Sequence, residues 1–187
     1  MKRIFDGLVA LFSLIILFIP MTIIYVLIIF ESIGGPVFKQ RRSGQDDIEF
    51  DLYKFRSMII GTPDIATHQL VNSDNYITKV GKFIRKYSLD ELPQLWNILI
   101  GDMSLVGPRP ALYNQYDLRE ARNKLGISIL KPGLTGWAQI NGRDDISLDK
   151  KIELDYYYLQ HKSFWFDIKI IVLTFLTVFK GTGTNPQ

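Results

Sequence analysis

The hydrophobic pattern of the chain is dominated by one long apolar run at its start. Residues 7–30 include no charged side chain, and a run of this length can cross a bilayer as one helix. Cations flank it on both sides, with Lys2 and Arg3 before it and three more within residues 39–42, whereas the positive-inside rule expects them on one side. Pro20, near the middle, is expected to kink or break the helix. The run therefore predicts either one spanning helix or a re-entrant helix that bends at Pro20.

After this run the pattern changes to short strands. Residues 37–40 and 48–56 predict the two strands of a hairpin, with a turn at residues 43–46. Along the second strand, apolar residues at every other position give way to Lys54 and Arg56, which we expect on the same face. These two cations suit either a solvated strand end or a phosphate-binding surface.

Amphipathic helices are expected in the rest of the chain. The helix over residues 76–87 is basic, which suits either anionic lipid headgroups or solvent. The helix over residues 163–179 is rich in Phe, Ile, Leu and Val but marginal in length for a span. A position in the membrane interface or against the core is therefore favoured for it. Two more helices are predicted over residues 111–124 and 149–160.

Two adjacent carboxylates, Asp90 and Glu91, stand just before a short apolar helical run. Ser88 and Glu91 also fit a capping box, in which both side chains satisfy free N–H groups at a helix start. Pro93 agrees with that interpretation, because proline is tolerated in the first turn of a helix. A purely structural role for this stretch is therefore open.

The functional alternative gives the two carboxylates separate roles. Consecutive helical residues point about 100° apart, so Asp90 and Glu91 are not expected to share one task. A helix N-terminus would favour the ionised form of Asp90, as a nucleophile or metal ligand. Glu91 would then hold a hard cation such as Mg2+, which binds oxygen ligands and bridges to substrate phosphates.

Loops punctuated by glycine and proline follow the dyad. Residues 101–110 include Arg109 between two prolines, and residues 131–143 contain three glycines and end at Arg143. This spacing indicates tight turns or a close approach of the backbone to a ligand, although the Gly-Lys-Ser/Thr ending of a Walker A loop is missing. Arg143 suits either bidentate phosphate binding or a surface ion pair.

Composition restricts the remaining possibilities. With 187 residues the chain is long enough for one domain and a membrane element. It contains no cysteine, which excludes a disulfide framework and thiolate metal sites. Its formal net charge of +3 is too small to indicate nucleic acid, and no nucleic-acid partner is expected.

Taken together, the motifs resemble the bacterial sugar transferase family, the monotopic polyprenyl-phosphate phosphoglycosyl transferases. The resemblance covers nearly the whole chain, and the order and spacing of the motifs make it specific. The motifs that carry it are residues 53–58, 88–94, 101–104, 107–110 and 132–143. The chain resembles the small, catalytic-unit type of this family.

This resemblance implies an enzyme that transfers a sugar 1-phosphate from a UDP-sugar to a polyprenyl phosphate, such as undecaprenyl phosphate, and releases UMP. It implies that Asp90 attacks the sugar-bearing phosphate to form a covalent intermediate, while Glu91 helps to position Mg2+. Both carboxylates are the expected metal ligands. Cations are needed because both substrates are anionic. The expected substrate-binding residues are Lys54, Arg56, Arg109 and Arg143.

The resemblance also implies an α/β architecture, namely a small irregular mixed domain with a short β-hairpin and interfacial amphipathic helices. Residues 1–33 would form a re-entrant membrane helix. Residues 34–187 would form the catalytic domain, on the cytoplasmic face of the bacterial inner membrane. Two positions depart from the family pattern: Ile19 stands where many members have serine, and Asp144 where an uncharged polar residue is expected.

Two other functions stay open on the sequence. A non-catalytic membrane-anchored adaptor would use the basic clusters for anionic lipid and the dyad only as a cap, so that Asp90→Asn would leave its function intact. A metal-dependent glycosyltransferase or phosphatase without a covalent intermediate would release nucleoside diphosphate or inorganic phosphate. The sequence does not identify the sugar, the polyprenol or the oligomeric state.

Overall fold

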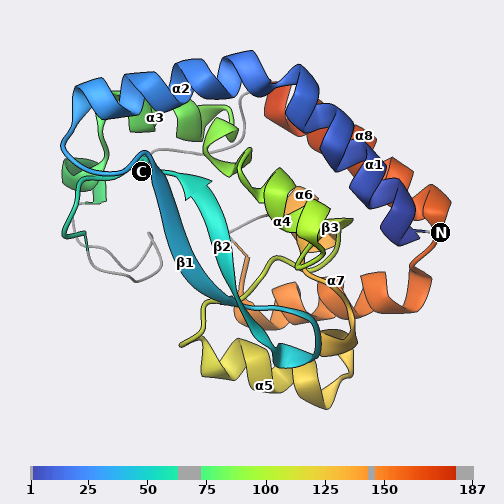
Figure 1. Cartoon of the computed structure of the whole chain (residues 1–187). Coiled ribbons are helices and arrows are strands. Elements are labelled where there is room, and N and C mark those ends of the chain that lie inside the picture. Colours follow the sequence, from blue (N-terminus) through green and yellow to red (C-terminus); the bar gives the residue numbers. More distant parts are fainter. Residues whose placement is uncertain (1, 63–72, 143–145, 180–187) are drawn as a thin grey trace.

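Helices surround two small sheets in the computed structural model of the chain, which describes residues 2–62, 73–142 and 146–179 (Figure 1). The strands are β1 (Val37–Ser43), β2 (Glu49–Phe55), β3 (Ser104–Val106) and β4 (Gly133–Thr135). The α-helices are α1 (Lys2–Ile16), α2 (Phe18–Glu31), α3 (Lys79–Lys86), α4 (Gln94–Ile100), α5 (Tyr116–Lys124), α6 (Trp137–Ile140), α7 (Leu148–His161) and α8 (Phe164–Phe179).

The apolar N-terminal run folds as two helices, α1 and α2, which meet at Leu17 with a bend of 63°. The sequence predicts a break at Pro20, and the structure places it one turn earlier. Pro20 has no N–H to donate to the carbonyl of Ile16, and its ring crowds that carbonyl. No described helix is by itself long and apolar enough to cross a bilayer, but the bent pair meets that test of length and composition.

The start of α1 is fixed to the rest of the molecule by polar contacts. Arg3 donates to two carbonyls at the end of α4, to Ile98 O at 2.5 Å and to Leu99 O at 2.7 Å. Asp6, which is buried, accepts a hydrogen bond of 2.6 Å from the Ser104 hydroxyl. The first turns of α1 therefore lie against α4 and β3.

The end of α2 is fixed to the same domain. Arg56, just after β2, donates to Ser32 O at 2.8 Å and to Ile33 O at 2.6 Å. Glu31 accepts from the backbone N–H of Val80 at 3.1 Å, at the start of α3. Both outer ends of the bent pair thus contact one domain, and Figure 1 shows α1 and α2 along one side of it, with α3 beneath α2.

The predicted hairpin is confirmed. β1 and β2 pair antiparallel from Val37 opposite Phe55 to Ser43 opposite Glu49. β1 is longer than the predicted first strand, residues 37–40, because its pairing with β2 continues through Arg41 and Arg42 to Ser43. In Figure 1 the hairpin runs from the region of α2 and α3 toward α5.

The side chain of Asn97 in α4 bonds the backbone of β2, as a neighbouring third strand would. Its Oδ1 accepts from Tyr53 N at 3.0 Å, and its Nδ2 donates to Asp51 O at 2.8 Å. The side chain is fully buried, so both of its polar atoms need these partners. The contact fixes α4, which begins three residues after Glu91, against the strand that carries Lys54.

The second sheet, β3 with β4, is parallel and was not predicted. Ser104 lies opposite Gly133 and Val106 opposite Thr135. The backbones approach so closely that a Cβ added to Gly133 would lie 2.1 Å from the nitrogen of Gly107. Gly107, Gly133 and Gly136 of the two predicted loops therefore serve this close approach.

The main hydrophobic core joins α1, β2, α4, β3, α7 and α8. Its buried members are Ala10, Leu52, Leu95, Ile98, Met103, Leu105, Val106, Tyr158 and Ile170. The four helices expected after the hairpin are present as α3, α5, α7 and α8, although α5 begins at Tyr116 and not at residue 111. The mixed α/β class with a short hairpin is confirmed.

Candidate active site

The dyad lies in a 3-10 turn, Leu89–Glu91, between α3 and α4. Ser88 before it has a φ of 54°, and its side chain makes no capping hydrogen bond, so the capping-box interpretation is wrong. The regular helix α4 starts only after Pro93. The two carboxylates are therefore not used to begin a helix.

Glu91 is paired with two cations from different parts of the chain. Its Oε1 accepts from Lys54 Nζ at 2.9 Å and from Arg109 Nη2 at 3.1 Å. Lys54 Nζ also lies 4.0 Å from Asp90 Oδ2. The Lys54 side chain is only 17% exposed, so this end of the strand is not a solvated one. The structure thus brings four of the predicted site residues together.

The pKa values of the two carboxyl groups move in opposite directions. Burial raises the pKa of Asp90, and the charge of Glu91 adds to this effect while Lys54 opposes it. Burial also acts on Glu91, but Lys54 and Arg109 outweigh it and hold the pKa of Glu91 well below its usual range. The sequence predicted that Asp90 lies at a helix N-terminus that favours its ionised form. Asp90 instead lies buried in a 3-10 turn before α4, so the predicted helix N-terminus is absent at this residue.

The donor atoms near the dyad are compatible with Mg2+. The described residues contain no group of three or more Asp, Glu or His side chains that could hold a metal. Mg2+ commonly needs only one or two carboxylates, because waters and substrate phosphates complete its coordination. Asp90 and Glu91 are two such carboxylates, and their binding of Mg2+ stays a prediction.

Two of the predicted substrate-binding cations are not part of this cluster. Arg56 is 7% exposed, and its guanidinium donates to the carbonyl oxygens of Ser32 and Ile33 at the end of α2. Arg56 does not continue the strand face of Lys54 as predicted, because the strand ends at Phe55, and its role as a phosphate ligand stays a prediction. Arg143, like Asp144, lies outside the residues that the structure describes.

The loop that contains Arg109, residues 107–110, is bonded through its backbone to a buried ion pair that the sequence analysis missed. Arg122 Nη1 donates to the backbone oxygen of Arg109 at 2.9 Å. The same guanidinium pairs with Asp155 Oδ2 at 2.6 Å, and the two side chains are 9% and 2% exposed. Nothing in the sequence pairs these residues, since they lie 33 positions apart on helices with mixed charge.

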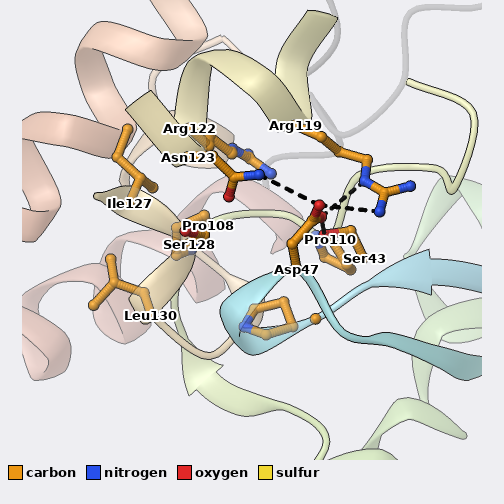
Figure 2. A pocket seen from close by; sticks show the side chains of 12 residues that line it. Ser43, Asp47, Pro108, Pro110, Arg119, Arg122, Asn123, Ile127, Ser128 and Leu130 are labelled. Carbon is orange, nitrogen blue, oxygen red and sulfur yellow. Dashed lines mark hydrogen bonds and ion pairs between the residues drawn. The ribbon is translucent and has the colours of Figure 1, made fainter. Parts of the chain in front are cut away.

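The other side of the loop borders a cavity, which Figure 2 shows between the hairpin turn and α5. Asp47 accepts there from Arg119 Nε at 2.8 Å and from Ser43 Oγ at 2.6 Å. The hydrogen bond from Arg119 lowers the pKa of Asp47. This cluster ties the hairpin turn to α5 and supports the loop that lies between them.

A smaller indentation adjoins the dyad. Its lining residues are Arg42, Leu52, Lys54, Gln94, Arg109 and Pro110. Arg42 and Gln94 were not predicted as site residues. The concentration of cations favours an anionic ligand, and a carboxylate beside them can act as an oxygen nucleophile toward phosphorus. The arrangement therefore suits phosphoryl transfer.

Comparisons with known proteins agree with this chemistry. Residues 1–181 match the family described as bacterial sugar transferase. The chain is 44% identical to the "Uncharacterized sugar transferase EpsL" of Bacillus subtilis over 189 residues, which cover 98% of this chain and 89% of that protein.

Two further relatives have names that state a reaction. The chain is 40% identical to the "UDP-glucose:undecaprenyl-phosphate glucose-1-phosphate transferase" of Escherichia coli, over 97% of this chain and 40% of that protein. It is also 40% identical to the "UDP-N-acetylgalactosamine-undecaprenyl-phosphate N-acetylgalactosaminephosphotransferase" of Aeromonas hydrophila, over 86% of this chain and 39% of that protein. The chain therefore spans only about two fifths of each of these two relatives.

Proposed function

This chain belongs to the bacterial sugar transferase family, and we propose that it transfers a sugar 1-phosphate from a UDP-sugar to undecaprenyl phosphate, with release of UMP. This would be a membrane step in the synthesis of a glycoconjugate, such as a capsule, an O-antigen, an exopolysaccharide or a glycoprotein glycan. The observation that carries the proposal is the cluster of Lys54 and Arg109 on the Asp90–Glu91 dyad. The named reactions of the two relatives that are 40% identical support the same substrates.

Asp90 is the proposed nucleophile. One of its carboxylate oxygens forms a bond to the sugar-bearing phosphorus while the bond from that phosphorus to the UMP oxygen breaks. An oxygen of the polyprenyl phosphate then attacks the same phosphorus and releases the Asp90 carboxylate. Burial raises the pKa of Asp90, and the positive charge of Lys54 beside it opposes this effect and favours the ionised form that attacks.

Lys54, Arg109 and Glu91 have supporting roles in this proposal. The two cations neutralise the phosphate charges that would otherwise repel the attacking carboxylate. Glu91 is kept ionised by them and holds both in place. Asp90 and Glu91 would together hold Mg2+, which supplies additional positive charge for the phosphates when bound.

We also propose that the bent pair α1–α2 is a re-entrant membrane element and that the catalytic domain lies on the cytoplasmic face of the inner membrane. Residues 1–33 would form this element and residues 34–187 the domain. The support is that Arg3 near one end and Glu31 at the other both contact the same domain. A straight span would carry these two ends to opposite sides of the bilayer.

The test uses purified protein in detergent with Mg2+, undecaprenyl phosphate and a panel of UDP-sugars, and it measures UMP release. The unaltered chain should release UMP with at least one donor, and Asp90→Asn should reduce the rate by roughly 1,000-fold or more, as expected for loss of a nucleophile. Asp51→Asn is the matched control, because this β2 carboxylate is 52% exposed and should leave the rate unchanged.

Three outcomes would point elsewhere. UMP release that survives Asp90→Asn would contradict the nucleophile. UDP or inorganic phosphate as the product would favour a metal-dependent glycosyltransferase or phosphatase without a covalent intermediate. A chain that reacts with no donor of the panel would favour a membrane-anchored adaptor.

A further inference from the structure

Helix α4 contains two buried side-chain amides with different hydrogen bonding. Asn97 uses both of its amide atoms to bond β2, at 3.0 and 2.8 Å. Gln94, one turn earlier, is 2% exposed, yet its Nε2 has no hydrogen-bond partner among the described residues. A buried donor without a partner lowers stability, so a native structure that keeps one calls for an explanation.

The surroundings of Gln94 indicate what its amide could bind. Of the three buried side-chain polar atoms without a partner in the described parts of the chain, it alone belongs to a residue that lines the indentation beside the dyad. Lys54 and Arg109, which pair with Glu91, line that indentation too. Its positive charge selects an anionic ligand, and an anionic oxygen is the acceptor that an N–H donor lacks.

We propose that Gln94 is a substrate-binding residue whose Nε2 donates a hydrogen bond to a phosphate oxygen of a substrate seated between Lys54 and Arg109. The inference rests on the proposed function for the identity of that substrate. The phosphate belongs either to the nucleoside diphosphate of the donor or to the polyprenyl phosphate. Bonding to it satisfies the amide only in the complex, so the free protein is less stable than it would be with an apolar residue at this position.

The decisive variant is Gln94→Met, which removes the donor and keeps an unbranched side chain of similar size. Its melting temperature without ligand should equal or exceed that of the unaltered chain, because an unsatisfied polar group is lost. Its affinity for the ligand should nevertheless fall about 10- to 100-fold, as expected for a hydrogen bond to a charged acceptor. A residue with a merely structural role would not combine these two effects.

Binding is measured in detergent as the ligand-dependent rise in melting temperature, with UDP and, separately, with a short-chain polyprenyl phosphate. A loss of affinity for UDP assigns the bond to the donor diphosphate, and a loss for the polyprenyl phosphate alone assigns it to the acceptor. Gln115→Met is the matched control: the Gln115 Oε1 accepts from Leu112 N at 2.8 Å, so this variant should melt earlier and keep both affinities.

A second variant guards against an unexpected effect of methionine. Gln94→Glu replaces the donor with an acceptor and should weaken binding of the same ligand more than Gln94→Met does. Unchanged affinity for both ligands in Gln94→Met, or no binding by the unaltered chain, would overturn the inference. Binding that depends on Gln94 without UMP release from any donor would instead count against the proposed function and leave the Gln94 contact in place.

Discussion

Asp90 and Glu91 are neighbours in the sequence, but their contacts give them different charge behaviour. Lys54 and Arg109 both bond the same oxygen of Glu91, and their charges stabilise the ionised form of this carboxyl group. Asp90 is buried with no described cation closer than 4.0 Å, and its pKa is raised. A pair of carboxyl groups whose pKa values are moved apart is the usual basis for a division of roles in catalysis.

This difference predicts opposite effects of the two amide variants on stability. The folded pKa of Glu91 lies below its ordinary value of 4.5, so the stability that it contributes is fully present above that pH and is lost as the pH falls toward the folded pKa. Glu91→Gln should therefore lower the melting temperature at neutral pH. The difference in melting temperature between this variant and the unaltered chain should become smaller in acid. Thermal unfolding from about pH 3 to about pH 8 measures it.

For Asp90 the contribution to stability changes with pH in the opposite direction. Its folded pKa is raised above 3.8, so its contribution is present below that pH and is lost as the pH rises through the folded pKa. Asp90→Asn should therefore melt no earlier than the unaltered chain at neutral pH, even though we expect it to lose most of its UMP release. Equal destabilisation by both variants at neutral pH would show that the two environments do not differ in this way.

Among the secondary-structure elements, α5 and α7 illustrate how the site is supported from outside. Arg122 of α5 pairs with Asp155 of α7 and also donates to the backbone of Arg109. Burial raises the pKa of Asp155 despite the opposing charge of Arg122. The pair thus fixes two helices and, through one hydrogen bond, the loop whose arginine reaches the dyad.

Breaking this pair on one side should be costly. Arg122→Met leaves the Asp155 carboxyl buried without its cation, and we expect a loss of roughly 3–5 kcal/mol in the free energy of unfolding. The double variant Arg122→Met/Asp155→Leu should recover much of this loss, because no uncompensated charge remains. Urea unfolding in detergent measures both. A single variant as stable as the double would mean that the ion pair contributes little.

The double variant also separates stability from function. It restores the packing of the two helices but lacks the hydrogen bond from Arg122 Nη1 to the oxygen of Arg109. Its UMP release should therefore stay below that of the unaltered chain even when its stability is recovered. Equal rates would show that the Arg109 loop does not need this bond.

For the whole molecule, the proposed re-entrant role of the bent helix pair rests on where its apolar and polar side chains lie. The side chains of α1 and α2 are largely apolar and exposed on the outer surface, including Phe12, Ile15, Phe18 and Phe30. The two ends of the pair, by contrast, make polar contacts with the domain. A chain of this shape can insert its bend into a bilayer while both ends stay on one side.

Cysteine labelling tests this topology directly, because the chain has no cysteine of its own. Single cysteines at Lys2 and Lys39, 45% and 60% exposed, mark the two sides of the bent pair. A cysteine at Lys150, which is 51% exposed on α7, marks the catalytic domain. All three should react with an impermeant reagent only from the cytoplasmic face of membrane vesicles. Labelling of the Lys2 position from the opposite face would establish a spanning helix.

Much of the fold and part of the site follow from local patterns. The apolar run, the hairpin and the four later helices are set by periodicity over a few residues, and their types were predicted correctly. Asp90 and Glu91 stand out because two carboxylates beside Pro93 form an unusual local combination. The exact position of the break at Leu17 also has a local cause in Pro20, but it falls one turn earlier because the proline acts on the carbonyl four residues before it.

The tertiary structure decided which side chains meet. Lys54 and Arg56 belong to one predicted strand, yet one reaches Glu91 and the other bonds the end of α2, because their partners come from segments distant in the sequence. The Arg122–Asp155 pair and the unpartnered amide of Gln94 likewise exist only once α5, α7 and β2 are packed. The sequence by itself determined most of the elements and the candidate pair of carboxylates, since these depend on short-range patterns. Charge pairing and burial depend on long-range packing, so only the folded chain could assign them.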